Sequence, residues 1–318
     1  MFRLIALLLG GSLAASMAMA QFGGRPGDVV IYAVTSKGSP EFHAVPANTV
    51  NTQAGFQIVD TLSQPPAPFG DAFPGESYIT LHSEDNDSFR YIIQKENIQT
   101  QHNTFAAAAK LLIAEGIDRL LIPNKTPVDL TAGLYAPFPA NVDFGPELPE
   151  MEAHSFMWTA SPTFPLLVPA DPSYRSPLDP PGQTGSEYVL SLGSFDALVP
   201  WIGLNTTYPG QGWKQGIDVR TMETDAAAGV TVRMIRLRPG RATPPFVIDG
   251  NTHLAVLQGS VNLTPTSGGQ AVTLTRFQYA FIPNGFAIVL SNPAAYSGPT
   301  ADFNPFAPYP NPFNPVQP

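Results

Sequence analysis

The sequence predicts a mainly β protein, with a small antiparallel β-barrel near its C-terminal end and a β-rich domain with one helix before it. From Gly229 to Asn292, short β-type runs follow one another, each bounded by glycine or proline, which is typical of a barrel or sandwich. Charged residues make up only 13% of the chain and hydrophobic residues 43%, which favours large apolar cores over disorder. A length of about 300 residues beyond the leader is typical of two domains.

The N-terminal leader predicts export. Arg3 precedes an apolar run, Leu4–Leu9, and small residues end at Ala18-Met19-Ala20, which is the layout of a secretory signal peptide over residues 1–20. The alternative is a membrane anchor, but a membrane span normally needs about 20 apolar residues. We therefore expect cleavage near Ala20, a secreted or periplasmic location and no membrane span.

Composition excludes several partners and chemistries. The formal net charge is −9, whereas nucleic-acid binding needs a cationic surface, so we expect no nucleic-acid partner. The chain has no cysteine, which rules out disulfides, thiolate metal sites and cysteine nucleophiles.

The N-terminal domain is predicted over residues 25–140. Residues 28–49 suggest two strands around a turn at Lys37, and a third run covers Phe56–Leu62. Residues 76–93 predict a hairpin, because Asp85-Asn86-Asp87 separates two alternating runs and Asn and Asp tolerate the backbone conformations of tight turns.

One helix is predicted in this domain, over residues 104–115. Four consecutive alanines favour helix, Leu111-Leu112-Ile113 provides a buried side, and Gly116 can end it. Leu121-Ile122-Pro123-Asn124 echoes Phe281-Ile282-Pro283-Asn284, which leaves open whether this domain is a degenerate copy of the C-terminal one.

Proline-rich segments follow. Residues 141–185 predict an extended, ordered connection with a strand at His154–Thr159, because frequent prolines forbid long β-ladders. A proline-rich tail is expected over residues 300–318. The barrel is assigned to residues 186–299, with seven strand-like runs in its central stretch: 230–235, 246–248, 253–257, 261–264, 272–275, 280–282 and 287–290.

This central stretch also carries the spacing of two motifs. In the first, Gly240 is followed by five residues, Phe246-Val247-Ile248, three residues, Thr252, six residues and Gly259. In the second, Phe277 is followed by five residues, Pro283-Asn284-Gly285, two residues, Ile288, three residues and Asn292. The pattern resembles the two motifs of the cupin superfamily, whose members are small jelly-roll β-barrels. Only Phe277 departs from the scaffold positions, where the family has glycine.

The resemblance implies a metal site whose ligands are missing. Metal-binding cupins place three histidines and one glutamate where this sequence has Phe246, Ile248, Thr252 and Ile288. These side chains are poor ligands for a divalent transition metal, so we expect no metal and no cofactor. If the four residues line the barrel interior, that interior suits close packing or an apolar small ligand.

Other candidate residues have simpler interpretations. His253 lies one position after the family's glutamate, so its side chain should face away from the barrel interior and form a hydrogen bond or an interface contact. His43, His82, His102 and His154 are scattered. His82 with Glu84 and Asp85 could in principle bind a hard cation, but the ligand pattern of an EF-hand loop is absent, so this segment is interpreted as a solvated acidic turn. Thr252 and Ser260 have no evident base that would make either a nucleophile.

The densest basic cluster lies on one predicted strand and its following turn. It consists of Arg233, Arg236, Arg238 and Arg241. It could grip an anionic ligand, but the favoured interpretation is pairing with the acidic residues of the preceding strand and loop, Asp218, Glu223 and Asp225.

Three hypotheses follow. The favoured one is an exported cupin-like protein without the usual metal site, acting as a binding or structural module and not as an enzyme. The second is a metal-independent cupin enzyme acting on a carbohydrate or small organic acid, which would need a group such as His253 or Glu223 inside the barrel. The third is assembly into a homodimer through the apolar outer face of the strand at residues 253–257.

Overall fold

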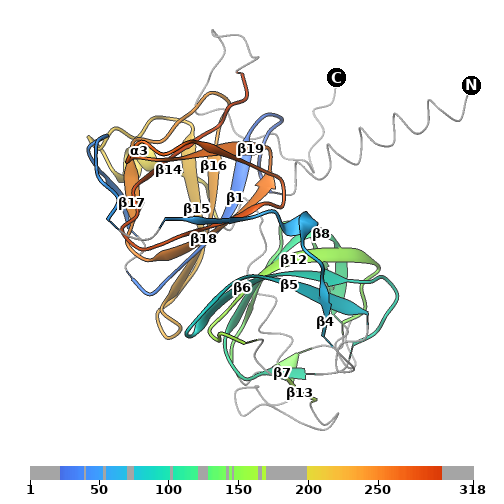
Figure 1. Ribbon diagram of the computed structural model, residues 1–318. Helices are drawn as coiled ribbons and strands as arrows, with labels where there is room; N and C mark the ends of the chain where they lie inside the picture. The colour runs from blue at the N-terminus through green and yellow to red at the C-terminus, as the bar shows by residue number, and fades with distance from the viewer. Residues whose placement is uncertain are drawn as a thin grey trace, which may run out of the picture.

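The computed structural model describes residues 22–38, 41–52, 55–69, 75–100, 103–120, 128–140, 143–144, 147–163, 167–169 and 199–295. These residues form two β-barrels (Figure 1), each built from two sheets that face one another across an apolar core. The mainly β jelly-roll prediction is confirmed. Within the described residues, the helical turns are α3 (Leu204–Thr207) and the short 3-10 helix η1 (Thr61–Ser63).

The N-terminal barrel contains the strands drawn mostly in green in Figure 1. They are β4 (Ala67–Pro68), β5 (Glu76–Glu84), β6 (Asp87–Gln94), β7 (Asn103–Phe105), β8 (Ala109–Leu120), β9 (Val128–Thr131), β10 (Tyr135–Phe138), β11 (Asp143–Phe144), β12 (Met151–Thr159) and β13 (Leu167–Pro169). One sheet has the order β10-β8-β12-β6-β5-β4 with β9 paired to β8, and the other has the order β11-β7-β13.

The C-terminal barrel combines strands from both ends of the chain. They are β1 (Val29–Ser36), β2 (Phe42–Ala44), β3 (Gln57–Val59), β14 (Ile202–Gly203), β15 (Ile217–Asp225), β16 (Val230–Leu237), β17 (Phe246–Ile248), β18 (Asn251–Gln258), β19 (Ser260–Pro265), β20 (Val272–Thr275), β21 (Tyr279–Ile282) and β22 (Ile288–Ser291). Its sheets have the orders β14-β15-β16-β1-β18-β21-β3 and β2-β17-β22-β19-β20. The strand runs predicted between Val230 and Leu290 are confirmed.

The two barrels share one topological plan. Reading the large sheets in parallel, β4-β5-β6-β12-β8-β10 corresponds to β14-β15-β16-β1-β18-β21. In the small sheets, β13-β7-β11 corresponds to β2-β17-β22. A left-handed glycine also recurs after the equivalent stretches, at Gly116 (φ 82°) and Gly259 (φ 76°). The chain is therefore an internal duplication, which the sequence had left open.

The duplicated halves exchange strands. β1 fills the gap between β16 and β18 in the C-terminal barrel, and β12 fills the equivalent gap between β6 and β8 in the N-terminal barrel. The C-terminal barrel is thus completed by strands that lie far from the rest of it in the sequence, whereas β12 and β13 directly follow the other strands of the N-terminal barrel. Without β1 the C-terminal barrel could not bury its core, and without β12 the N-terminal barrel could not bury its own.

This exchange corrects the predicted boundaries. Residues 29–59 pair with the C-terminal barrel and so do not belong to one domain with the rest of residues 25–140. The predicted connection over residues 141–185 contains β11, β12 and β13, which belong to the N-terminal barrel. The strand expected at His154–Thr159 lies within β12. The leader, the tail from residue 300 and Leu121–Asn124 lie outside the described residues.

The helix predicted over residues 104–115 is wrong, because this range forms parts of β7 and β8. Ala109, Leu111 and Ile113 face the core of the N-terminal barrel, whereas Leu112 and Ala114 face the other barrel. A strand covered on both faces reads as a continuous apolar run, and here burial on both faces overrides the helix propensity of alanine. By contrast, the hairpin between β5 and β6 is confirmed, with Asp85 at a positive φ of 45°.

The two large sheets pack against each other. Their facing surfaces form an aromatic-rich core that includes Tyr32, Phe89, Tyr91, Phe156 and Tyr279. The outer face of β18 is therefore covered by the N-terminal barrel. In the described part of the chain, no helix is long and apolar enough to cross a membrane.

We predict that β1–β3 are required for the C-terminal barrel to fold. A chain lacking residues 22–62 should lose its near-UV circular dichroism, because the gap between β16 and β18 would expose both apolar cores. A permuted chain that starts at residue 63 and carries residues 22–62 on a flexible linker after residue 295 is the matched control and should fold. Native-like dichroism of the chain lacking residues 22–62 would contradict the conclusion that β1–β3 complete the C-terminal barrel.

Candidate functional site

The four positions of the expected metal centre lie in the core of the C-terminal barrel. Phe246 and Ile248 come from β17, Thr252 from β18 and Ile288 from β22, and their exposed fractions are 1%, 4%, 0% and 1%. Phe246 and Ile288 are paired across neighbouring strands. The Thr252 hydroxyl is 3.2 Å from that of Thr35 and donates to the Gly250 carbonyl at 3.3 Å.

Aromatic side chains fill the space beside these positions. The ring of Phe246 lies 5.3 Å from that of Trp213 and 5.8 Å from that of Phe42. Phe42 and Trp213 also contact each other edge to face, at 5.8 Å. A transition metal wants imidazole or carboxylate ligands, and none of the four side chains provides one. The residues present therefore do not fit the metal that the family would imply.

Phe277 keeps the backbone conformation of the glycine that the family has at this position. Phe277 adopts a φ of 68°, a left-handed conformation that costs a non-glycine residue about 1 kcal/mol or more. Its N–H donates to the Val256 carbonyl at 2.7 Å, and its ring lies 5.8 Å from that of Tyr91 in the N-terminal barrel. The backbone requirement thus persists, while the side chain joins the contact between the barrels.

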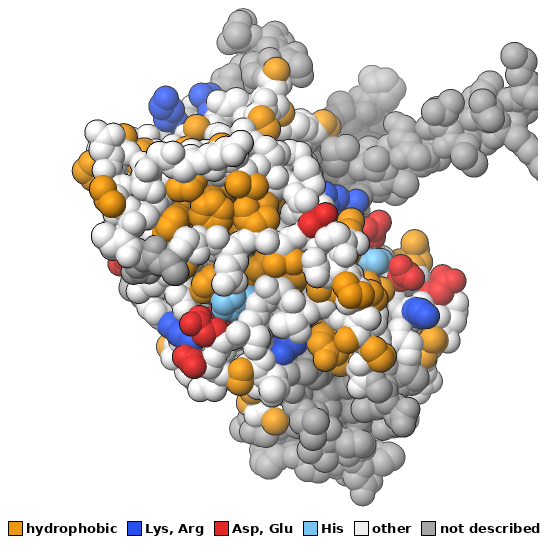
Figure 2. All heavy atoms as spheres, viewed as in Figure 1, with side chains coloured by type: hydrophobic (Ala, Val, Ile, Leu, Met, Phe, Trp, Pro, Cys, Tyr) orange, Lys and Arg blue, Asp and Glu red, His pale blue; other side chains and the backbone are white. Residues whose placement is uncertain are grey.

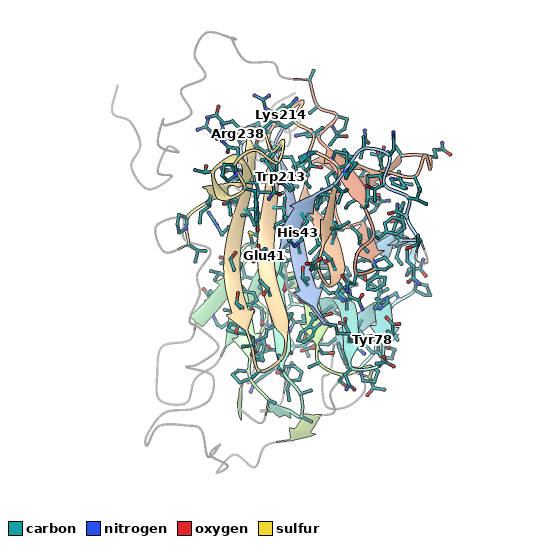
Figure 3. The ribbon with its side chains drawn as sticks, turned by 90° about the vertical axis from the view of Figure 1, so that its left-hand side faces the viewer. Glu41, His43, Tyr78, Trp213, Lys214 and Arg238 are labelled. Carbon is teal, nitrogen blue, oxygen red and sulfur yellow. The ribbon has the colours of Figure 1, made fainter. Side chains whose placement is uncertain are left out.

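Charged and polar groups surround the filled barrel at its surface. The Tyr208 hydroxyl donates to Glu41 at 2.6 Å, and His43 lies 2.9 Å from Asp249. Figure 3 shows Glu41 and His43 on the same side of this barrel as Trp213. The His43 pair is about half exposed on both sides, so it is a surface ion pair of small energetic weight.

His253 faces the N-terminal barrel, as its position in the strand predicted. It is fully buried, with Nε2 3.0 Å from Asp87 Oδ1 and Nδ1 2.8 Å from the Tyr279 hydroxyl. Asp87 also accepts hydrogen bonds from Ser36 and Trp158. Burial alone would raise the pKa of Asp87, but these hydrogen bonds outweigh it and lower the pKa to about 2. Asp87 is therefore a buried anion shared by both barrels.

A second polar network crosses the same interface. Lys110 Nζ, on the N-terminal barrel, lies 3.0 Å from Glu223 Oε1 and 2.7 Å from Asp225 Oδ2. Tyr135 also donates to Glu223. Pairing of Glu223 and Asp225 with the arginine cluster was therefore a wrong prediction, because their partner comes from the other barrel. Pairing with Asp218 is confirmed: Arg236 lies 2.7 Å from it and Arg238 3.9 Å.

An open groove of about 600 Å³ lies on the seam between the barrels, and sequence reasoning missed it. Its lining comes from β3, β5, β18 and β21: Gly55, Gln57, Thr80, Leu81, His82, Ser83, Glu84, Asn251, Phe281 and Pro283. Figure 2 shows one face of the molecule, on which hydrophobic side chains form several patches and charged side chains are scattered around them. No local motif could have identified the groove, because its walls are far apart in the sequence.

His82 forms part of the groove wall and is more buried than the sequence suggested. Its ring stacks on that of Phe281 at 3.8 Å and meets that of His253 edge to face at 5.3 Å. Burial and the nearby His253 lower the pKa of His82, which favours a neutral imidazole. The following acidic turn was predicted to be solvated. This holds for Glu84 and for Asp85, whose side chain is 84% exposed, but not for Asp87, which is buried.

The remaining histidines do not converge. His154 contacts Tyr91 and Glu152 on the N-terminal barrel, and His102 lies outside the described residues. Among the residues that the structure describes, no three His, Asp or Glu side chains are arranged to hold a metal ion.

Comparison with solved structures confirms the cupin fold. No protein-family profile matches the chain, and no curated protein matches it in sequence. A putative dioxygenase from Nostoc punctiforme superposes with a TM-score of 0.51 at 14% identity, over 76% of this chain and 79% of that one. An oxalate decarboxylase variant from Bacillus subtilis superposes with a TM-score of 0.50 at 11% identity, over 77% and 75%. A salicylate 1,2-dioxygenase from Pseudaminobacter salicylatoxidans gives 0.50 at 12%, over 70% and 75%. At these identities the likeness establishes the fold alone.

We predict that Asp87→Asn destabilises the protein by roughly 2–3 kcal/mol, because it removes the buried negative charge that accepts hydrogen bonds from His253, Ser36 and Trp158. Because the pKa of Asp87 is lowered to about 2, its stabilisation is complete above about pH 4 and is lost as pH falls through about 2. Urea unfolding of wild type and variant across this range checks both points. Asp85→Asn, on the exposed turn, is the control. Equal stability of all three proteins would refute the assignment of Asp87 as a stabilising buried anion.

Proposed function

We propose that this chain is an exported, metal-free protein of the cupin fold that acts by binding and not by catalysis. The observation that carries the proposal is the packed apolar set Phe246, Ile248 and Ile288, with Thr252 bonded to its neighbours, at the positions of the metal centre. The leader over residues 1–20 supports export.

In the interior of the C-terminal barrel, the enzyme alternative lacks the acid or base that it requires. Metal-independent catalysis inside the barrel would need an acid or base there, and His253 and Glu223 were the candidates. His253 contacts Asp87, and Glu223 contacts Lys110, both in the layer between the barrels. The geometry therefore gives no support to catalysis by His253 or Glu223 in the interior of the C-terminal barrel.

We place binding in the groove between the barrels, since the four interior positions are closely packed. A groove of about 600 Å³ lies within the usual range for small-molecule sites, roughly 300–1,000 Å³. Gln57, Thr80, Ser83 and Asn251 offer hydroxyl and amide groups, which can both donate and accept hydrogen bonds. With His82 neutral, Glu84 provides the charge in this wall. These features suit a neutral, hydroxyl-rich ligand, such as a saccharide or polyol.

The first prediction concerns metal. After incubation with iron, manganese, zinc or nickel and gel filtration, the wild-type protein should retain no stoichiometric metal, because its four positions lack ligands. The variant F246H/I248H/T252E/I288H should retain a single divalent ion, measured by elemental mass spectrometry. Stoichiometric metal bound to the wild-type protein at low-micromolar affinity would overturn the proposal.

The second prediction concerns the groove. Calorimetric screening of neutral saccharides, polyols and sugar acids should identify a neutral ligand. Gln57→Trp should weaken its binding at least tenfold by filling the groove from β3. Gln64→Trp, on the exposed segment after η1, is the control and should leave affinity unchanged. Equal affinity of both variants would remove the groove from the proposal, and turnover of a saccharide would favour the enzyme alternative.

A further inference from the structure

A layer of carboxyl groups closes one end of the N-terminal barrel. Glu76 on β5, Asp118 on β8 and Glu147 before β12 are 8%, 0% and 5% exposed. Gln94 on β6 lies among them, and its Nε2 donates to Glu76 Oε1 at 3.3 Å and to Glu147 Oε2 at 3.0 Å. Burying three acidic side chains together is costly unless they are neutralised.

The equivalent layer of the C-terminal barrel is apolar. Glu76 pairs with Gln94 as Ile217 pairs with Leu237 in the corresponding hairpin. Asp118 follows Gly116 by two residues, as Val261 follows Gly259. Ile217, Leu237 and Val261 all belong to the core of their barrel. The fold therefore does not require acids at this end, and the N-terminal barrel has acquired them.

Glu147 also has an apolar counterpart. The N–H of Leu148 donates to the Arg119 carbonyl at 2.7 Å, which sets the segment around Glu147 against the end of β8. In the C-terminal barrel, Leu290 occupies the corresponding place against β19 and is 1% exposed.

Hydrogen-bond acceptors outnumber donors in this layer. Both oxygens of Asp118 and Oε1 of Gln94 are buried with no hydrogen-bond donor facing them among the described residues, and Asp118 lies within hydrogen-bonding reach of the Glu147 carboxyl group. Both hydrogens of Gln94 Nε2 are already assigned to Glu76 and Glu147. The missing donors must come from outside this set, and protons on the carboxyl groups are the smallest donors that fit.

A small cavity next to the layer gives an independent indication. It has a volume of about 30 Å³ and is lined by Glu76, Gln94, Glu147 and Ser155 on its polar side, which is room for about one water molecule. Ser155 is fully buried, and its Oγ has no hydrogen-bond partner in the described part of the chain. An unsatisfied hydroxyl facing the acids marks a place where a proton or a water molecule is bound.

Basic groups on the surrounding elements are directed elsewhere. Arg119, next to Asp118 on β8, pairs at the surface with Asp129 and Glu150. Arg90, on β6, binds Ser88 and Thr159 toward the other end of the barrel. Lys110 on β8 and Asp87 on β6 are engaged at the contact between the barrels. Lys95, Glu96, Glu115 and Glu152, on or next to these strands, are exposed.

We propose that this carboxyl layer is a proton-binding site, which holds shared protons at neutral pH and makes closure of the N-terminal barrel depend on the pH of the medium. Burial raises the pKa of Glu76 to about 8 and that of Asp118 to about 7. Burial and the two neighbouring acids raise the pKa of Glu147 well above its ordinary value.

These shifts fix the direction of the pH response. The folded layer binds more protons than the unfolded chain, whose acids titrate near about pH 4. Its contribution to stability is therefore complete below about pH 4 and is lost as pH rises through the folded values of about 7 and 8. Beyond that range, the negative charges repel one another and the end of the barrel opens.

The test combines infrared spectroscopy with unfolding as a function of pH. Wild-type protein should show the carbonyl band of protonated carboxyl groups at neutral pH, and the band should weaken as the pH rises through about 7 and 8. The decisive variant carries the apolar layer of the other barrel: Glu76→Ile, Gln94→Leu, Asp118→Val and Glu147→Leu. It should lose both the band and the fall in stability at alkaline pH.

Two further variants keep the result interpretable. Glu150→Gln changes an exposed acid nearby and should retain both the band and the pH response. Glu76→Gln is a near-isosteric change that should weaken the band. It provides the test if the fourfold variant fails to fold. Absence of the band from the wild-type protein at neutral pH would overturn the proposal, as would an unchanged band and pH response in either layer variant.

Discussion

The contact between Asp87 and His253 lies in the buried layer between the two barrels. Neither barrel could expose its side of this layer to water and remain stable. Around this contact lie the rings of Phe89 and Tyr279, and a second charged network joins Lys110 to Glu223 and Asp225. Strand exchange also ties the two halves of the chain together, since the C-terminal barrel is completed by β1, which lies far from its other strands in the sequence. The chain therefore folds as a pair of barrels, and the seam between them is a fixed feature of the molecule.

Duplication allowed the two barrel interiors to diverge. The C-terminal barrel is closely packed where metal-binding relatives coordinate their ion, with Phe246 against Trp213 and Phe42. The N-terminal barrel instead carries Glu76, Asp118 and Glu147 at a layer that its counterpart fills with aliphatic side chains. With the usual site closed, the seam offers the accessible concave surface described above. For this reason we propose a binding function between the barrels.

Much of the fold could be predicted from the sequence, because the Gly240 and Gly285 spacings and the alternation along β16 are local signals. The helix at residues 104–115 was mispredicted because alanine propensity is local, whereas burial of β8 on both faces is set by distant strands. The outward direction of His253 followed from strand periodicity alone. Its partner Asp87, the groove at His82 and the acids near Gln94 all depend on which distant segments meet. No pattern within one segment encodes that information.

The most direct test of this account is to map ligand contacts on the backbone amides by nuclear magnetic resonance, during titration with a neutral saccharide that binds. The account predicts that the largest shift changes fall on Gln57, on residues 80–84 and on Asn251, along the walls of the groove. The amides of Phe246, Ile248 and Ile288 should change little, because their side chains are packed inside the barrel. Changes concentrated at those three residues, with the groove unaffected, would contradict the central claim.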